Sequence, residues 1–398
     1  MKLPFVRFLL VMACPGAMAY AAGDNLTRVE PLPTPSLKWQ NLALPPGKPR
    51  FPLTDRVWPA TSGEATVCLW EDDKLAAISL TIDDNEAQDV PFWLALAQKH
   101  DVKLTWFLVT GGIGKKDSGL AGTWELWKQV KAQGHSLQSH TVTHLGGMRS
   151  PDWKGIAWEY AESPRTLDEM LPGQRTRALA YPGTGDERQK ANSKDVAAGQ
   201  YAAARGVQGY LNQANKIAYM AVNCCFSINL GDSEKSPWND ITLIINPDST
   251  KPYQKTYYRG WCVLGFHHLD NKPGATTTHT PANVTRLFDW ITANRQDLWP
   301  APFLDAALYG QERDTATVKT LRADEQRISL MLTSEMDPKR FDYPLTVKIR
   351  LPSRWETVRA SQAGGAIPAE RITHAGIPFA LVKAKPDCGP IDLTPANP

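Results

Sequence analysis

The sequence predicts an α/β fold with a parallel sheet and outer helices, followed by a small antiparallel β region. Between about residues 68 and 295, short apolar runs of strand character alternate with segments of helical periodicity. Polar residues of catalytic type follow four of the expected strands, which is where parallel sheets place their chemistry. After about residue 315, apolar residues occur at every second position, as in antiparallel strands. Repeating β-α units fit a sheet that is open or closed into a barrel.

The first elements follow from apolar spacing and end signals. The run Ala76–Ile82 is short and apolar and is followed by Asp83-Asp84, so we expect a buried strand. Thr123 and Gly134 fit the N-cap and the C-terminal stop of a helix between them. The expected elements here are a strand at 76–82, a helix near 90–97, a strand at 102–109, a helix at 124–133 and a strand at 136–138.

The later elements continue the alternation. We expect a helix at 153–171, a strand at 177–181, a helix at 195–205, a strand at 261–266 and a helix at 283–292. Alternating apolar residues at 328–332 and 345–351 predict strands of the C-terminal region. This pattern places the α/β domain at 67–312 and a small β domain with its tail at 313–398.

The N-terminus has the features of a secretory signal peptide, which we assign to residues 1–21. Two positive charges precede the apolar stretch Phe8–Cys14, which is too short to span a bilayer, and small residues follow at cleavage spacing. We therefore expect export to the periplasm or the medium, with lipoprotein anchoring at Cys14 as the alternative. Residues 22–66 are rich in proline and predict an extended lead-in to the main domain.

Composition and charge exclude several classes of protein. The chain has 398 residues and a formal net charge of +3 without basic clusters, which argues against a nucleic-acid partner or an anionic membrane surface. After the signal peptide no apolar run is long enough for a transmembrane segment. The cysteines beyond Cys14 form no C-x-x-C pair, so a cysteine zinc site is not expected.

The stretch S-H-T-V-T-H at 139–144 predicts a metal site when it is combined with the carboxylates after the first strand. Zinc and similar ions favour imidazole nitrogen and carboxylate oxygen, so Asp83 or Asp84 with His140 and His144 offers three ligands. The remaining carboxylate fits a general base for water. The alternatives are exposed histidines in a polar turn and an Asx turn that caps the next helix. We expect His135 to be structural.

Four segments in this order resemble the polysaccharide deacetylase family, with the nodulation-protein-B homology domain (carbohydrate esterase family four). They are S-L-T-I-D-D at 79–84, S-H-T-V-T-H at 139–144, A-Y-P-G-T-G at 180–185 and V-L-G-F-H at 263–267. The resemblance covers roughly residues 70–295, and Y-A-A-A-R-G-V at 201–207 looks like a helix before a later strand of that family. It implies a distorted (β/α) barrel and removal of acetyl groups with a divalent metal.

The resemblance also assigns roles to single residues. It implies Asp84, His140 and His144 as ligands of one divalent ion, Zn2+ first and Co2+, Mn2+ or Ni2+ as alternatives. Asp83 would be the general base on a metal-bound water, and His267 the general acid, with His268 as its alternative.

The loop Tyr181-Pro182-Gly183 would bind the reacting acetyl group. The backbone N–H of Gly183 would stabilise the oxyanion there, and Tyr181 would shape the loop.

Two positions depart from the family pattern. Its third motif often carries an arginine that orients the base, whereas this chain has Ala180 before Tyr181, and the nearest arginine is Arg177. The fourth motif, an Asp-Trp pair, has only a loose counterpart in Trp238-Asn239-Asp240.

The expected function is therefore an exported metal-dependent hydrolase that removes N- or O-acetyl groups from an acetylated poly- or oligosaccharide. Two rivals remain. One is a catalytically weak or silent carbohydrate-binding protein that retains the metal site. The other is a metal hydrolase of a non-carbohydrate C–N bond.

Overall fold

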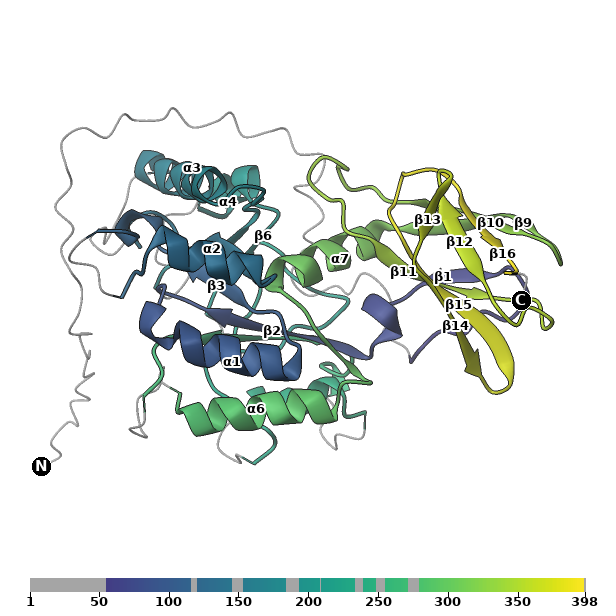
Figure 1. The fold of residues 1–398 in the computed structure, drawn as a ribbon, viewed down its shortest axis with the longest axis horizontal. Helices are drawn as coiled ribbons and strands as arrows, with labels where there is room; N and C mark the ends of the chain where they lie inside the picture. Colours follow the sequence, from purple (N-terminus) through teal and green to yellow (C-terminus); the bar gives the residue numbers. More distant parts are fainter. Residues whose placement is uncertain are drawn as a thin grey trace, which may run out of the picture.

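The computed structural model describes residues 55–115, 120–144, 153–183, 193–207, 209–232, 239–247, 255–270 and 279–396 (Figure 1). The predicted signal peptide 1–21, Cys14 and most of the predicted lead-in lie outside the described residues. Figure 1 shows two parts side by side, an α/β domain and a β domain, with α7 (Phe303–Thr315) reaching from one to the other.

The α/β domain is built on a parallel sheet. In the described residues its strands run in the order β6-β5-β4-β3-β2-β7, and β8 pairs with β2. The strands are β2 (Ala76–Ile82), β3 (Thr105–Leu108), β4 (Ser136–Ser139), β5 (Ala178–Ala180), β6 (Ala203–Arg205), β7 (Trp261–Phe266) and β8 (Leu298–Pro300). The helices are α1 (Val90–His100), α2 (Trp124–Ala132), α3 (Trp153–Met170), α4 (Ser193–Gln200) and α6 (Pro281–Ala293), with single turns η2 (Glu71–Asp73), η3 (Ala87–Asp89), η4 (Thr110–Gly112) and η7 (Ile241–Ile244).

The segment 219–225 closes this sheet. Val222 N donates to Ala204 O of β6 at 2.9 Å, and Cys225 N donates to Val263 O of β7 at 2.9 Å. Both bridges are parallel, so the segment lies between the two edge strands where a regular strand would stand. The predicted distorted (β/α) barrel is confirmed.

Strand β2 shows why this region folds as a barrel. All seven of its residues are buried, as expected for a strand with helices on one face and the barrel interior on the other. Ile78 and Ile82 pack in the outer cluster with α1 and α6. Ser79 and Thr81 alternate with them, and Ser79 Oγ accepts from Trp261 Nε1 at 3.0 Å while Thr81 Oγ1 donates to Leu264 O at 2.9 Å. The buried hydroxyls are therefore satisfied.

Thr123 and Gly134 lie at the start and just past the end of helix α2, as predicted. Thr123 Oγ1 accepts from Leu126 N at 3.2 Å, and Gly134 has a φ of 82°, which favours glycine. Most other predicted elements are present within a few residues of the expected bounds.

The predicted helix at 195–205 is wrong in its second half. Helix α4 ends at Gln200, and Ala203–Arg205 form strand β6, which pairs in parallel with Ala178–Ala180. Alanine favours a helix locally, but here the three residues fill the space beside β5 in the closed barrel, and tertiary pairing outweighs propensity. The same correction applies to 201–207, which the family resemblance gave as a helix before a strand.

The C-terminal part is antiparallel β, as predicted, and the structure shows two sheets packed as a sandwich. Its sheets have the orders β1-β11-β15-β14 and β13-β12-β16-β10-β9 in the described residues. They share one core, in which Leu330 and Val347 come from opposite sheets. The strands are β1 (Ala65–Val67), β9 (Thr317–Ala323), β10 (Ile328–Thr333), β11 (Leu345–Arg350), β12 (Arg359–Gln362), β13 (Gly365–Ile367), β14 (Ala369–His374), β15 (Ile377–Ala384) and β16 (Ile391–Thr394).

Strand β1 links the two ends of the chain. It falls at 65–67, where the sequence predicted the last residues of an extended lead-in, and it pairs antiparallel with β11. The lead-in therefore ends as an edge strand of the C-terminal domain. The boundaries 22–66, 67–312 and 313–398 stay predictions.

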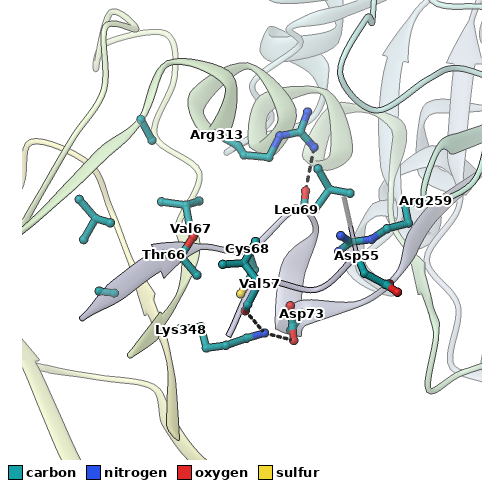
Figure 2. A pocket seen from close by; sticks show the side chains of 13 residues that line it. Asp55, Val57, Thr66, Val67, Cys68, Leu69, Asp73, Arg259, Arg313 and Lys348 are labelled. Carbon is teal, nitrogen blue, oxygen red and sulfur yellow. Dashed lines mark hydrogen bonds and ion pairs between the residues drawn. The ribbon is translucent and has the colours of Figure 1, made fainter. Parts of the chain in front are cut away.

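The two domains meet at the amino ends of the barrel strands, around a cavity of about 320 Å³ (Figure 2). Nζ of Lys348 on β11 lies 2.6 Å from Asp73 Oδ2 and donates to Val57 O at 2.9 Å, and Figure 2 marks both contacts with dashed lines. Arg313 of α7 donates to Leu69 O at 2.7 Å. These contacts tie the lead-in, the barrel and the sandwich together at one place.

Two further observations concern the cysteines and the helices. The described cysteines, 68, 224, 225, 262 and 388, are all free thiols. None of the helices in the described part of the chain has the length and apolar character needed to cross a bilayer.

Candidate active site

Three segments meet at the carboxyl edge of the barrel. Asp83 and Asp84 follow β2, His140 follows β4, and His267 follows β7. Nε2 of His140 lies 3.5 Å from Asp84 Oδ1, and Nε2 of His144 lies 3.2 Å from the same oxygen. Nε2 of His267 lies 3.7 Å from Asp84 Oδ2. The structure thus brings together side chains that are up to 184 positions apart (267 − 83).

Asp84, His140 and His144 fit a divalent metal ion. One ligand atom from each lies within 4.8 Å of the other two. Nδ1 of His140 is 2.8 Å from Ala180 O, and since a carbonyl only accepts, Nδ1 carries a proton, and Nε2 is the ring atom that faces Asp84 and would bind the ion once it is deprotonated. Two imidazoles and one carboxylate are a donor set that Zn2+ takes readily, with positions left for water or substrate.

The charges of the cluster favour an ionised Asp84. Burial raises the pKa of this carboxyl, but the hydrogen bond from His140 and the nearby charges of His140, His144 and His267 outweigh it and hold the pKa below its usual value. Burial lowers the pKa of His140, yet Asp83 and Asp84 together raise it above the usual value. Protons and a cation therefore compete for the same histidine.

Asp83 is the spare carboxylate, and one arginine holds it. Its side chain is 3% exposed, and the guanidinium of Arg205, fully buried at the end of β6, donates to Oδ1. The second oxygen, Oδ2, lies 4.0 Å from His140 Nε2 and 3.9 Å from His267 Nε2. Arg205 itself lies against the rings of Phe107 and Phe226, at 4.9 and 5.5 Å from their centroids. One oxygen of Asp83 is thus anchored while the other faces the site.

Sequence reasoning missed Arg205. It sought an arginine near the third motif, but Arg177 instead bonds Asp342 of the C-terminal domain at 2.9 Å. The segment A-A-A-R-G at 202–206 could have indicated it, because an arginine there ends an apolar run before a glycine, as at the end of a strand. The prediction of a helix over 195–205 excluded this interpretation. Of the loose fourth-motif candidate, Trp238 lies outside the described residues, and Asp240 caps η7 by accepting from Thr242 N at 3.0 Å.

The structure separates the two adjacent histidines after β7. His267 stacks on Phe226 with ring centroids 5.1 Å apart and turns Nε2 toward the two aspartates. His268 is half exposed and places Nδ1 3.1 Å from Asp89 Oδ2. His135 is buried below the site, where its Nδ1 accepts from Leu104 N at 3.1 Å, and burial lowers its pKa to about 4. It is part of the scaffold, as predicted.

The loop after β5 lies on the same edge of the barrel. Tyr181 is buried, donates its hydroxyl to Met220 O at 2.9 Å and its backbone N–H to Arg205 O at 3.0 Å. Pro182 is also buried, whereas Gly183 is exposed and has a φ of 73°. The Tyr181 ring thus fastens the loop to the barrel, and the binding role of Gly183 stays a prediction.

Comparisons with known proteins find similar sequences. Residues 71–201 match the family model described as polysaccharide deacetylase. The chain is 36% identical over 369 residues to a protein named gellan lyase from a Bacillus species, a match that spans 88% of this chain but only 14% of that relative.

Two solved structures are also similar in part. One is a deacetylase of Streptococcus pyogenes in complex with acetate, 25% identical, covering 36% of this chain and 62% of that one, with a TM-score of 0.33. The other is a putative polysaccharide deacetylase from Mycobacterium smegmatis, 15% identical, covering 63% of this chain and 93% of that one, with a TM-score of 0.38.

Proposed function

Because this chain belongs to the polysaccharide deacetylase family through residues 71–201, we propose that it is an exported, metal-dependent deacetylase that hydrolyses acetyl groups of a poly- or oligosaccharide. The observation that carries the proposal is that the two neighbouring carboxylates have different partners. Asp84 lies with His140 and His144 as a candidate ligand set, whereas one oxygen of Asp83 is anchored by Arg205. A site that only bound metal would have no use for a second, separately anchored carboxylate.

The first part of the mechanism activates water. A divalent ion on Asp84, His140 and His144 would polarise the acetyl carbonyl and make water more acidic. Asp83 accepts the proton of the attacking water through Oδ2, since Arg205 occupies Oδ1. The contact of Arg205 with Oδ1 fixes the direction of the free oxygen.

The second part expels the sugar. As water adds, the carbonyl oxygen becomes negative, and the backbone N–H of Gly183 donates to it. The bond from the acetyl carbon to the sugar nitrogen or oxygen then breaks, and His267 donates a proton from Nε2 to the leaving atom. Acetate and a free amine or hydroxyl are the products. The stack of Phe226 on His267 supports this role, because it limits rotation of the ring.

Substrate and compartment are part of the proposal. The N-terminal sequence supports export, and the acetylated carbohydrate follows from the family. The relative named gellan lyase is far longer than this chain, and its name adds gellan to the polymers worth testing. Zn2+ is the proposed ion, with Co2+, Mn2+ and Ni2+ as alternatives.

The two departures from the family pattern, the missing arginine of the third motif and the missing Asp-Trp pair of the fourth, favour the rival function of a silent carbohydrate-binding protein. Arg205 removes the first of these grounds, because it supplies the missing arginine from a different strand. The fourth motif still has no counterpart among the described residues, so a direct assay decides.

The test is acetate release from chitin-, peptidoglycan-, xylan-, alginate- and gellan-type polymers in acetylated form, with and without a chelator. We expect release from at least one polymer, loss with chelator and recovery with Zn2+. Small acetylated amides serve as the comparison for a non-carbohydrate hydrolase. A metal-loaded protein that releases no acetate from any of them would overturn the proposal.

A further inference from the structure

The loop between the two metal-binding histidines is short and strained. Only Thr141, Val142 and Thr143 separate His140 from His144. Thr141 has a φ of 69° and His144 a φ of 62°, both in the left-handed region that residues with side chains avoid. A β-branched threonine in this conformation costs energy, so surrounding contacts must hold the loop in place.

A buried carboxylate on α3 supplies such contacts. Glu159 is 2% exposed, and one of its oxygens accepts from Val142 N at 2.7 Å and from Thr143 N at 3.0 Å. The other oxygen accepts from the hydroxyl of Thr143. These three hydrogen bonds engage both oxygens of Glu159.

The opposite side of the loop is held by backbone from η4. Gly111 N donates to Val142 O at 2.8 Å, and Thr110 N donates to Thr141 O at 3.1 Å. A side chain at position 111 would place its Cβ 2.5 Å from Val142 O, so only glycine allows this approach. Hydrogen bonds therefore hold the loop from two sides, with Glu159 on one side and the backbone of η4 on the other.

We propose that Glu159 is a positioning residue that holds loop 141–143 so that His140 and His144 face the same metal ion. The inference rests on the proposed metal site. Without Glu159 the strained loop 141–143 relaxes to another conformation. Metal binding must then restore the original conformation, and the free energy this costs weakens the observed binding. The hydrogen bonds of Glu159 go to Val142 and Thr143 between the two histidines, so its effect would be on metal affinity.

The test uses the full chain and measures the Zn2+ dissociation constant by competition with a chromophoric chelator, without substrate. We expect Glu159→Ala to weaken Zn2+ binding by about 10- to 100-fold, the range for residues that support metal ligands. Glu159→Gln keeps one accepting oxygen and should fall between the wild type and Glu159→Ala. The matched control is Glu169→Ala on the same helix, whose side chain is 64% exposed and pairs with Arg165 at the surface. It should bind Zn2+ like the wild type.

Two further variants keep the test decisive if Glu159→Ala fails to fold. Thr143→Val removes only the hydroxyl contact with Glu159 and should weaken Zn2+ binding by roughly threefold, the loss of one hydrogen bond. Gly111→Ala would press its Cβ against Val142 O on the other side of the loop, and it should weaken Zn2+ binding more than Thr143→Val does. Folded Glu159 variants with the wild-type constant, or an equal loss in Glu169→Ala, would overturn the inference. Zn2+ binding without acetate release would sink only the proposed activity, whereas a wild type that binds no Zn2+ sinks both.

Discussion

Both ends of the barrel carry a group of charged side chains, but the two groups have different roles. At the amino end, Lys348 and Asp73 bond each other with side chains 1% and 9% exposed. At the carboxyl end, His144, Asp84 and His267 are 36%, 35% and 28% exposed and point at one place. Closed pairs fasten two domains together, whereas charges that converge on an open edge can bind and react. Charged side chains thus stabilise the domain junction at the amino end and form the candidate active site at the carboxyl end.

The strongest test of this contrast is the spare carboxylate. Replacing Asp83→Asn should lower turnover by about 10²- to 10⁴-fold, the contribution of a general base, because an amide cannot take the proton of water. Metal content, measured by elemental analysis, should stay at the wild-type level. If turnover survives, or if metal is lost together with activity, the division of roles between Asp83 and Asp84 is wrong.

The matching change at the other end is Asp73→Asn, and asparagine tolerates the φ of 57° found there. It leaves Lys348 buried without its ionic partner, so the free energy of unfolding should fall by about 3 kcal/mol. Turnover per folded molecule should not change. The double variant with Lys348→Met should recover most of the loss, as seen by denaturant unfolding. A drop in turnover at full stability would contradict the assignment of this end to scaffolding.

A third test separates neighbouring histidines. His267→Gln should lower turnover by about 10²-fold, because the leaving group then departs without a proton. His268→Gln is the control, since this half-exposed side chain bonds Asp89 and not the site. Acetate release by both variants is compared at equal metal content. The reverse ranking would make His268 the acid.

The smallest expected effect is a pH dependence of the domain junction. Burial raises the pKa of Glu312 on α7 to about 8, and burial also raises that of Asp305 to about 7. The folded state therefore binds more protons than the unfolded one between pH about 4.5 and 8, so stability falls as pH rises through this window. A loss of about 1 kcal/mol would lower Tm by ~2–4 °C. Glu312→Gln should flatten the slope of Tm against pH, and an unchanged slope would rule out this group as its source.

Much of the site could be predicted because its residues follow local rules. Asp83 and Asp84 follow a short apolar run and His140 follows a short expected strand, and parallel strands bring such ends to one edge. His144 follows from its spacing to His140. The apolar patterns of β2, β7 and α2 are strong enough that their bounds were predicted within a few residues.

The remainder depended on contacts that local patterns do not contain. Arg205 reaches Asp83 across 122 positions only because residues 203–205 form a strand in the barrel and not the end of a helix. The choice of His267 over His268 follows from the ring of Phe226, and the support of the loop 141–143 follows from Glu159 on α3.

The sequence by itself thus determined most of the elements and the parallel α/β class, because hydrophobic periodicity and strand-end residues act over a few positions. The barrel and the candidate ligands were predicted through the family resemblance. Only the tertiary structure decided which charged side chains serve the site and which fasten the domains. The reason is physical. Arg205 and Arg177 are alike in the sequence, but burial beside Asp83 gives one a partner in the site, and the sandwich gives the other Asp342. Partners of buried charges are selected by closure of the barrel and docking of the β domain, which no single segment encodes.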